Sequence, residues 1–297
     1  MIEAPNNTEK RLKQIQNFIS RMPSLSTTAT KVLEICNRPD CSPNDLNRVI
    51  SLDPVLTGQV LKLINSAYYA LPNQINSMAR AIIMLGINTV KNLALSAAVL
   101  DGLGGKNAFE TLSMFDFWSH SICVGVTAKS LAAIKNIPAT DREEYFVAGL
   151  LHDLGKIPLN SRFPDQYIKV LELTKVVDMP TYQAENKVFG IDHCVVGGMI
   201  ADKWKLSRPL NDSLSYHHNP TEADEGSSRL TNMVALGDVY SNIMETGNSD
   251  DTAPDEPILN NLLEEVGVSW ASISGIYETI NEEIEKAKVF LQISQEG

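Results

Sequence analysis

Histidine and aspartate are the side chains of this protein best suited to chemistry, and their order along the sequence indicates a metal. All five histidines lie beyond a Gly-rich stretch at 101–107, and two aspartates accompany them. Neutral imidazole and carboxylate together are ligands for zinc, iron, manganese or nickel. The sequence therefore predicts one metal-type site, formed by His120, His152, Asp153, His193, His217, His218 and Asp238.

Each of these residues also has an ordinary structural explanation when it is taken alone. A single histidine on an apolar helix face is often a hydrogen-bonded core residue, and a histidine pair at a helix end can interact favourably with the helix dipole. An aspartate on an apolar face is harder to explain, because burial of a carboxylate needs a partner. The joint placement of all five histidines on inward faces or helix ends favours the metal site.

Helical periodicity predicts the elements that position these side chains. His120 lies on the apolar stripe of a helix expected from about 115 to 134, and His152-Asp153 follows an apolar helical run. The helix that carries the third histidine is expected to start after Asp192, which serves as its N-cap. The pair His217-His218 ends another helix, and Asp238 lies on an apolar face of the helical segment LTNMVALGDVYSNIM. Five helices are therefore expected to meet at the site.

The rest of the chain also has helical periodicity, and strand signals are almost absent. In the first hundred residues short helices are expected, one of them beginning with the N-cap and proline pair Ser42-Pro43. The Gly-rich stretch at 101–107 is the expected domain boundary, and the acidic segment 248–257 is expected to be a mobile loop. A final amphipathic pair is expected at about Leu259–Val266 and Trp270–Leu291. The predicted fold class is all-α.

Composition excludes several classes of function. The formal net charge is −11, and an acidic surface repels the phosphate backbone, so general nucleic-acid binding is not expected. The four cysteines include no CxxC pair, which favours a reducing, cytoplasmic compartment with buried thiols. The N-terminus has no signal-peptide pattern, and no apolar stretch reaches the roughly 20 residues that span a bilayer. A soluble protein with no membrane segment is expected.

The order H…HD…H…HH…D resembles the HD superfamily of metal-dependent phosphohydrolases. The full set of seven is similar to the expanded site of the HD-GYP branch, which holds two or three metals, commonly iron. Lys156 follows Asp153 by three residues, as the lysine of the family's HDxxK motif does. Asp116 lies one helical turn before His120, where some relatives carry an extra carboxylate ligand. The resemblance implies that all of these residues belong to one site.

The first half of the chain makes the resemblance more specific. The segments MPSLSTTATKVLEIC, DLNRVISLDPVLTGQVLKLINSAYYA and ARAIIMLGINTVKNLALS resemble the N-terminal half of HDOD (HD-related output domain) proteins. The later FWSHS, GLLHDLGK, DHCVVGGMIADKW and YHHNP are similar to that family too. The resemblance covers about residues 10–293. It implies an N-terminal helical bundle at 10–104, an HD-type helical domain with the metal site at 108–293, and a stand-alone bacterial signalling module.

The resemblance leaves two functions open. After His217-His218 the chain reads NPTEADEGSSRL, without the GYP motif that helps HD-GYP enzymes bind cyclic di-GMP, which argues against hydrolysis of that nucleotide. The first hypothesis is a regulatory module that binds a signalling protein or a nucleotide, holds one or two divalent ions and lacks fast turnover. The second is a phosphohydrolase of phosphodiesterase type acting on a nucleotide or cyclic nucleotide, with Asp153 and Lys156 as catalytic residues. In the second, Asp153 joins a metal held by His120, His152 and Asp238 to one held by His193, His217 and His218.

Two further alternatives remain at this stage. Lys156 is either a cation that neutralises charge on phosphoryl oxygens or a solvated lysine at a helix end. The histidine and aspartate set is either a metal site or a hydrogen-bonded polar core without metal.

Overall fold

The computed structural model describes residues 5–22, 25–36, 38, 40–103, 111–244, 256–275 and 277–296. Within these ranges the chain forms helices and no strand, which confirms the predicted all-α fold. In chain order the helices are α1 (Pro5–Arg21), α2 (Thr27–Cys36), α3 (Pro43–Ile50), α4 (Pro54–Ile64), α5 (Met78–Leu85), α6 (Ile87–Leu103), α7 (Met114–Ile134), α8 (Arg142–Leu151), α9 (Lys156–Arg162), α10 (Pro164–Val177), α11 (Thr181–Phe189), α12 (His193–Trp204), α13 (Arg208–Tyr216), the 3₁₀ turn η2 (Pro220–Glu222), α14 (Glu225–Ile243), α15 (Glu256–Val266), α16 (Trp270–Ser274), α17 (Tyr277–Ala287) and α18 (Val289–Glu296).

Local capping signals start two of these helices where the sequence predicts. Ser42 accepts a hydrogen bond from the Asp45 backbone N–H, and the Asp45 side chain accepts from the backbone N–H of Ser42. This reciprocal pair satisfies two N–H groups that the start of α3 leaves without helical partners. Asp192 accepts from the N–H of Val195 at the start of α12. Both predicted N-caps are confirmed.

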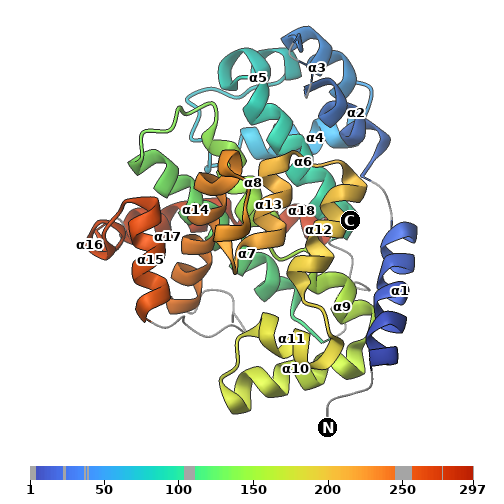
Figure 1. Ribbon diagram of the computed structural model, residues 1–297. Helices are drawn as coiled ribbons and strands as arrows, with labels where there is room; N and C mark the ends of the chain where they lie inside the picture. The colour runs from blue at the N-terminus through green and yellow to red at the C-terminus, as the bar shows by residue number, and fades with distance from the viewer. Residues whose placement is uncertain are drawn as a thin grey trace.

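Two long helices form the centre of the molecule (Figure 1). α7 packs between α8 and α14, and the chain from Phe117 to Ala128 is buried except at one position. α6 contacts α2, α4 and α5 on the N-terminal side and α8 and α18 on the other. In the view of Figure 1 the site helices α8, α12, α13 and α14 lie near the middle, with α9–α11 below them and α15–α17 at one side.

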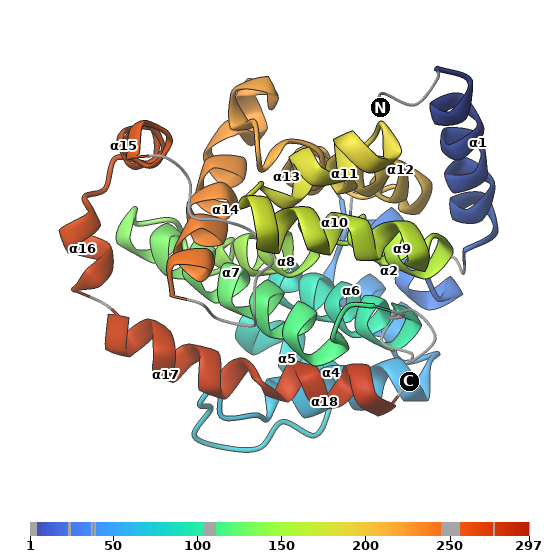
Figure 2. The same ribbon diagram turned by 90° about the horizontal axis from the view of Figure 1, so that it is seen from below.

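Helices from the two ends of the chain pack against segments far from them in the sequence. Figure 2 shows the C-terminal helices α17 and α18 along one edge, and α18 contacts α4 and α6. At the other end α1 lies against α9 and α12. The Nζ of Lys203 on α12 donates to the carbonyls of Ile19, Ser20 and Met22, which satisfies acceptors at the C-terminus of α1.

An ion pair between half-buried Lys129 and buried Glu143 links the early helices to the site helices. Lys129 on α7 donates to Glu143 Oε2 at 2.7 Å and to the Tyr68 hydroxyl at 3.0 Å, while Tyr69 donates to Glu143 Oε1. The Lys129 ammonium also lies 4.4 Å from the centre of the Tyr68 ring. Burial opposes the charged form, but Glu143 and Tyr68 outweigh burial and raise the pKa of Lys129. The first turn of α8 is thus tied to the segment after α4.

The C-terminal helices differ from prediction. The expected single helix at Trp270–Leu291 is divided into α16, α17 and α18. A capping box at Ser269 starts α16, and Gly275, a poor helix former, ends it. A turn at Lys288 separates α17 from α18. The helical periodicity of the sequence correctly predicts helix in this segment, but it gives no signal for the breaks between the three helices.

Other predictions fall partly outside the described residues. Of the expected boundary at 101–107, positions 101–103 belong to α6 and the remainder lies outside the described residues. Of the expected loop at 248–257, positions 256 and 257 begin α15 and the remainder likewise lies outside. The division into domains at 10–104 and 108–293 stays a prediction.

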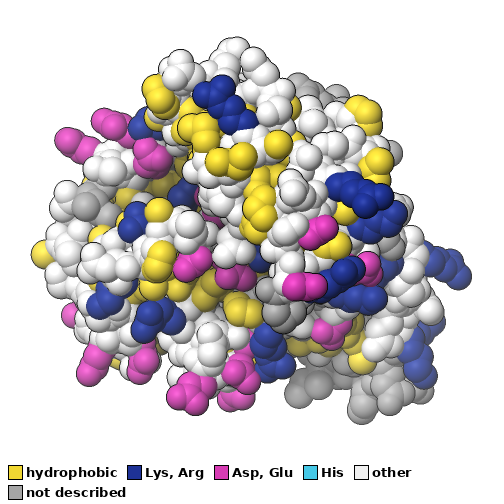
Figure 3. Space-filling view, turned by 90° about the horizontal axis from the view of Figure 1, so that it is seen from above, with side chains coloured by type: hydrophobic (Ala, Val, Ile, Leu, Met, Phe, Trp, Pro, Cys, Tyr) yellow, Lys and Arg dark blue, Asp and Glu magenta, His cyan; other side chains and the backbone are white. Residues whose placement is uncertain are grey.

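In the part of the chain that the structure describes, no helix combines the length and apolar character needed to cross a bilayer. Figure 3 shows hydrophobic, acidic and basic side chains interspersed on the face seen from above, and no histidine is visible on it.

Candidate metal centre

The structure brings all seven predicted histidines and aspartates together. His120 comes from the middle of α7 and Asp238 from α14, while His152-Asp153 follows α8. His193 is the first residue of α12, and His217-His218 directly follows α13. All are buried except His218, whose side chain is 16% exposed. Helix ends and inward helix faces from five elements therefore converge on one point, as the sequence predicts.

Asp153 lies between two groups of histidines. Its Oδ1 is 3.3 Å from His193 Nε2 and 3.8 Å from His217 Nε2. Its Oδ2 is 3.4 Å from His152 Nε2 and 3.7 Å from His120 Nε2. A carboxylate whose two oxygens face different ligand groups is placed to bridge two metal ions.

Asp238 completes the group around His120 and His152. Its Oδ1 is 3.1 Å from His120 Nε2 and 3.9 Å from His152 Nε2, and its Oδ2 is 4.0 Å from His218 Nδ1. Asn242, one helical turn later on α14, donates to Asp238 Oδ1 at 3.3 Å. Asp238 thus contacts histidines of both groups.

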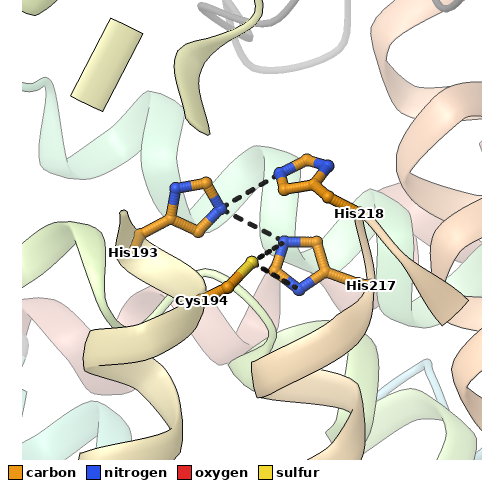
Figure 4. Close-up of side chains that lie close together, drawn as sticks. All are labelled: His193, Cys194, His217 and His218. Carbon is orange, nitrogen blue, oxygen red and sulfur yellow. Dashed lines mark hydrogen bonds between the residues drawn. The ribbon is translucent and has the colours of Figure 1, made fainter. Parts of the chain in front are cut away.

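The second group is formed by three histidines whose nitrogens face one another (Figure 4). His193 Nε2 lies 3.2 Å from His217 Nε2 and 3.1 Å from His218 Nε2. Cys194 lies beside them, with its sulfur 3.8 Å from both ring nitrogens of His217. A sulfur equidistant from both nitrogens lies on neither lone-pair direction. The three imidazoles are therefore the better ligand set, with Cys194 packed against it.

The opposite ring nitrogens are held by the protein. Nδ1 of His152 bonds the carbonyl of Gly149 at 2.7 Å, and Nδ1 of His217 bonds the carbonyl of Ser213 at 2.9 Å. A carbonyl only accepts, so each Nδ1 carries the proton and each Nε2 keeps a lone pair directed at the centre. Metal-binding histidines in proteins are oriented in this way. His120 Nδ1 is also held, by Ser241 Oγ at 3.0 Å.

Glu185 on α11 holds the Nδ1 atom of His193. This residue was not predicted from the sequence. Its fully buried carboxylate accepts from His193 Nδ1 at 2.6 Å and from the His193 backbone N–H at 2.7 Å, and its other oxygen accepts from Tyr167. Burial opposes the charged imidazole, but Glu185 outweighs burial and raises the pKa of His193. The only signal in the sequence is a glutamate eight residues before His193, with Gly190 between them.

We expect Glu185→Leu to lower the affinity for a divalent ion about 10- to 100-fold, because His193 loses the acceptor that orients its ring. Glu185→Gln keeps an acceptor without the charge and should lose less. The measurement is competition with a chromogenic chelator for zinc. Glu172→Gln removes an exposed carboxylate on α10 and serves as the control. Wild-type affinity in Glu185→Leu would remove Glu185 from the site.

The charges at the centre suit a cation. Burial lowers the pKa of His152 and holds that of His217 well below its usual value, so both rings are neutral near pH 7. Burial opposes ionisation of Asp153, but His152, Lys156 and the neighbouring histidines hold its pKa well below the usual value. His152 Nε2 and Asp153 Oδ1 are buried and without a hydrogen-bond partner. A buried acceptor without a donor is costly, and a divalent ion would satisfy both atoms.

Lys156 is not a solvated lysine. It begins α9, is 8% exposed, and its Nζ lies 2.7 Å from Asp153 Oδ2. The ammonium group is therefore within the centre, on the side of Asp153 that faces His120 and His152.

Asp116 stays a separate prediction. It lies in the first turn of α7 and is half-buried, and its backbone N–H donates to Ser113 Oγ. The ligand atoms that gather within 4.8 Å of one another in the described chain do not include its carboxylate.

A cavity of about 690 Å³ reaches the centre at His217, His218 and Asp238. Its walls come from the start of α11, the segment after α13, α14 and α15. This volume is within the range of small-molecule sites. A ligand in the cavity would thus contact the less buried side of the centre.

Comparison with known proteins identifies relatives of this chain. The HDOD domain family matches residues 22–220, a segment that holds the five histidines and ends before Asp238. An uncharacterized protein of Treponema pallidum (strain Nichols) is 26% identical over 238 residues, 80% of this chain and 45% of that protein. The chain thus spans about half the length of this curated relative.

Solved structures agree with this family match. The crystal structure of an HDOD domain protein of unknown function from Geobacter sulfurreducens is 26% identical, with a TM-score of 0.77 over 95% of this chain and 97% of that one. The crystal structure of a candidate phosphohydrolase from Shewanella amazonensis SB2B is 21% identical, with a TM-score of 0.70 over 93% of this chain and 97% of that one. The second likeness concerns the fold alone.

Proposed function

The chain belongs to the HDOD family, and from this premise and the geometry of its centre we propose that it is a bacterial signal-transduction module. In this proposal the centre holds one or two divalent ions, of Fe, Mn, Zn or Ni, without fast turnover. The module binds a nucleotide or a signalling protein in the cytoplasm. The observation that carries the metal is that His152 Nε2 and Asp153 Oδ1 are buried without a hydrogen-bond partner, beside the Nε2 atoms of His193 and His217.

The residues divide into two ligand sets that share one carboxylate. His120, His152 and Asp238 would hold one ion and His193, His217 and His218 the other, with Asp153 common to both. When bound, such ions supply Lewis acidity toward a phosphoryl oxygen. Lys156 adds a positive charge beside Asp153, and the cavity admits a ligand from the side of His218.

The connection that stands where HD-GYP proteins carry the GYP motif supports the proposal of slow or absent turnover. After His218 the chain makes the short turn η2 and enters α14, which is capped by Asp224. The Asp224 backbone N–H in turn donates to the buried carboxylate of Asp212. This compact connection places no basic side chain against the cavity, because none of the described lining residues is Lys or Arg.

A phosphohydrolase acting on a nucleotide or cyclic nucleotide is the second candidate. The buried ion pair of Lys156 and Asp153 favours it, since an ammonium group at this position can neutralise charge that develops on phosphoryl oxygens. In that case Asp153 and Lys156 are catalytic residues. Turnover of a phosphodiester by the metal-loaded protein, lost on Asp153→Ala, would establish this candidate over the first.

We expect the freshly purified protein to contain one or two divalent ions per chain, and His152→Ala to contain fewer, because the ring of His152 supplies a buried Nε2 to one ligand set. The measurement is elemental mass spectrometry after anaerobic purification under reducing conditions. Cys123→Ala, which changes a buried residue outside both ligand sets, is the control for folding. Wild-type protein without metal would show that the centre is a hydrogen-bonded polar core.

A further inference from the structure

The cavity beside the centre is lined by carboxamide side chains as well as by metal-ligand candidates. Four carboxamide side chains line it, each from a different element: Gln183 of α11, Asn219 after α13, Asn242 of α14 and Asn261 of α15. A carboxamide both donates and accepts hydrogen bonds without carrying charge. Three of them already use one amide atom within the protein: Asn242 donates to Asp238, Gln183 donates to the Tyr182 hydroxyl, and Asn219 accepts from Thr221. The remaining amide atoms match a ligand with donors and acceptors on one neutral edge.

Flat and apolar groups share the same walls. The Tyr182 ring stacks on the His218 ring, with centroids 4.5 Å apart and planes 22° from parallel. Pro180, Pro220 and Leu262 line the cavity with them. Aromatic and apolar surfaces favour a planar ring, and stacking on aromatic side chains is a general way to hold a nucleobase.

The charges of the cavity limit the ligand further. Asp178 and Asp238 line it, and no described lining residue is Lys or Arg. The lysine of the centre, Lys156, is already paired with Asp153. Two carboxylates disfavour a chain of phosphates in the cavity itself. The cavity therefore suits the uncharged part of a ligand better than its phosphate.

We propose that this cavity binds the base of a mononucleotide whose single phosphate lies at the metal centre. The inference rests on the proposed function for the phosphate and adds the ligand class: a nucleoside monophosphate or a cyclic mononucleotide, in preference to a nucleoside triphosphate. The carboxamides read the base edge, while the Tyr182–His218 pair and the prolines cover its faces.

The test is calorimetric titration of the metal-loaded full chain with inorganic phosphate, ribose 5-phosphate, the four common nucleoside 5′-monophosphates, their cyclic 3′,5′ forms and ATP. We expect at least one mononucleotide to bind about tenfold or more tightly than ribose 5-phosphate, through stacking and edge contacts, and more tightly than ATP. Equal binding of ribose 5-phosphate and every mononucleotide, or tightest binding of ATP, would overturn the inference.

Two variants on one helix assign the effect to the cavity. Asn261→Leu should lower mononucleotide affinity about tenfold and leave ribose 5-phosphate binding unchanged. Asn260→Leu changes a neighbouring exposed asparagine of α15 that does not line the cavity, and should change neither. Because both side chains are exposed, neither substitution is expected to disturb folding. If Asn261→Leu and Gln183→Leu, each made as a single variant, both keep wild-type affinity for the mononucleotide, the base site is contradicted.

Nucleosides separate this inference from the proposed function. They are titrated into metal-free protein beside ribose, so that neither metal nor phosphate contributes. If inorganic phosphate fails to bind the metal-loaded chain but a nucleoside binds and Asn261→Leu weakens it, the phosphate role fails and the base site stands. The other outcome is that phosphate binds, but no nucleoside binds more tightly than ribose and no mononucleotide more tightly than ribose 5-phosphate. In that case only the base site is wrong.

Discussion

Asp153→Asn is expected to remove metal from both ligand sets, leaving only assay background by elemental mass spectrometry. Among the described residues of the centre, Asp153 directs one oxygen to His193 and His217 and the other to His120 and His152. An amide in its place offers one weaker acceptor and one donor, and the donor repels a cation. A substitution at a single histidine removes a ligand from one set, whereas this one weakens both.

The same substitution leaves Lys156 buried beside a neutral amide, so a loss of stability accompanies the loss of metal. Asp212→Asn controls for that loss. Asp212 is also buried, pairs with Arg208 and accepts from the Asp224 N–H, but it belongs to neither ligand set. We expect Asp212→Asn to destabilise the fold by about 1–3 kcal/mol while metal content is unchanged. An Asp153→Asn protein that keeps both ions would contradict the bridging assignment.

Asp153→Asn also separates the two candidate functions. In the phosphohydrolase, turnover by a sample incubated with excess metal should fall to the level without enzyme. In the regulatory module, partner binding should persist wherever thermal denaturation shows an intact fold. Unchanged turnover in this variant would exclude Asp153 as a catalytic residue.

The all-α fold and the convergence of the site were predictable because their signals are local or chemically rare. Caps such as Ser42 and Asp192 act within one helical turn, and they start helices regardless of what packs on them later. Histidine is scarce, with five in 297 residues, so its position on an inward helix face is informative. The structure shows where these side chains meet, and their role as metal ligands stays a prediction.

What the sequence did not reveal depends on contacts between distant segments. Glu185 lies in a polar helix, TYQAENKVF, which has the composition of an exposed element. It is buried because Gly190, with φ of 79°, turns the chain so that α12 begins with His193 against it. The contact of α18 with α6 joins residues nearly two hundred positions apart, and no periodicity encodes it.

Among glycine-to-alanine substitutions near the metal centre, Gly155→Ala is expected to lower the stability of the fold most. Gly155 precedes Lys156 at the start of α9, and a Cβ there would overlap the His193 carbonyl oxygen and lie 2.7 Å from the His193 carbonyl carbon. It would also lie 2.8 Å from the Gly197 backbone nitrogen. These are backbone atoms, so no side-chain rotation relieves the overlap. Either α9 or the start of α12 must move.

Such a shift displaces Lys156 or His193, so stability and metal binding should fail together. We expect unfolding in urea to show a loss of about 3 kcal/mol and chelator competition to show at least about tenfold weaker metal binding. Gly58→Ala is the matched control, because Gly58 lies in the interior of α4 with no neighbouring atom within 4 Å of an added Cβ. That substitution should stabilise the protein by about 0.5–1 kcal/mol. A Gly155→Ala protein as stable as wild type would show that α9 and α12 are not in the close contact that holds Asp153, Lys156 and His193 in one centre.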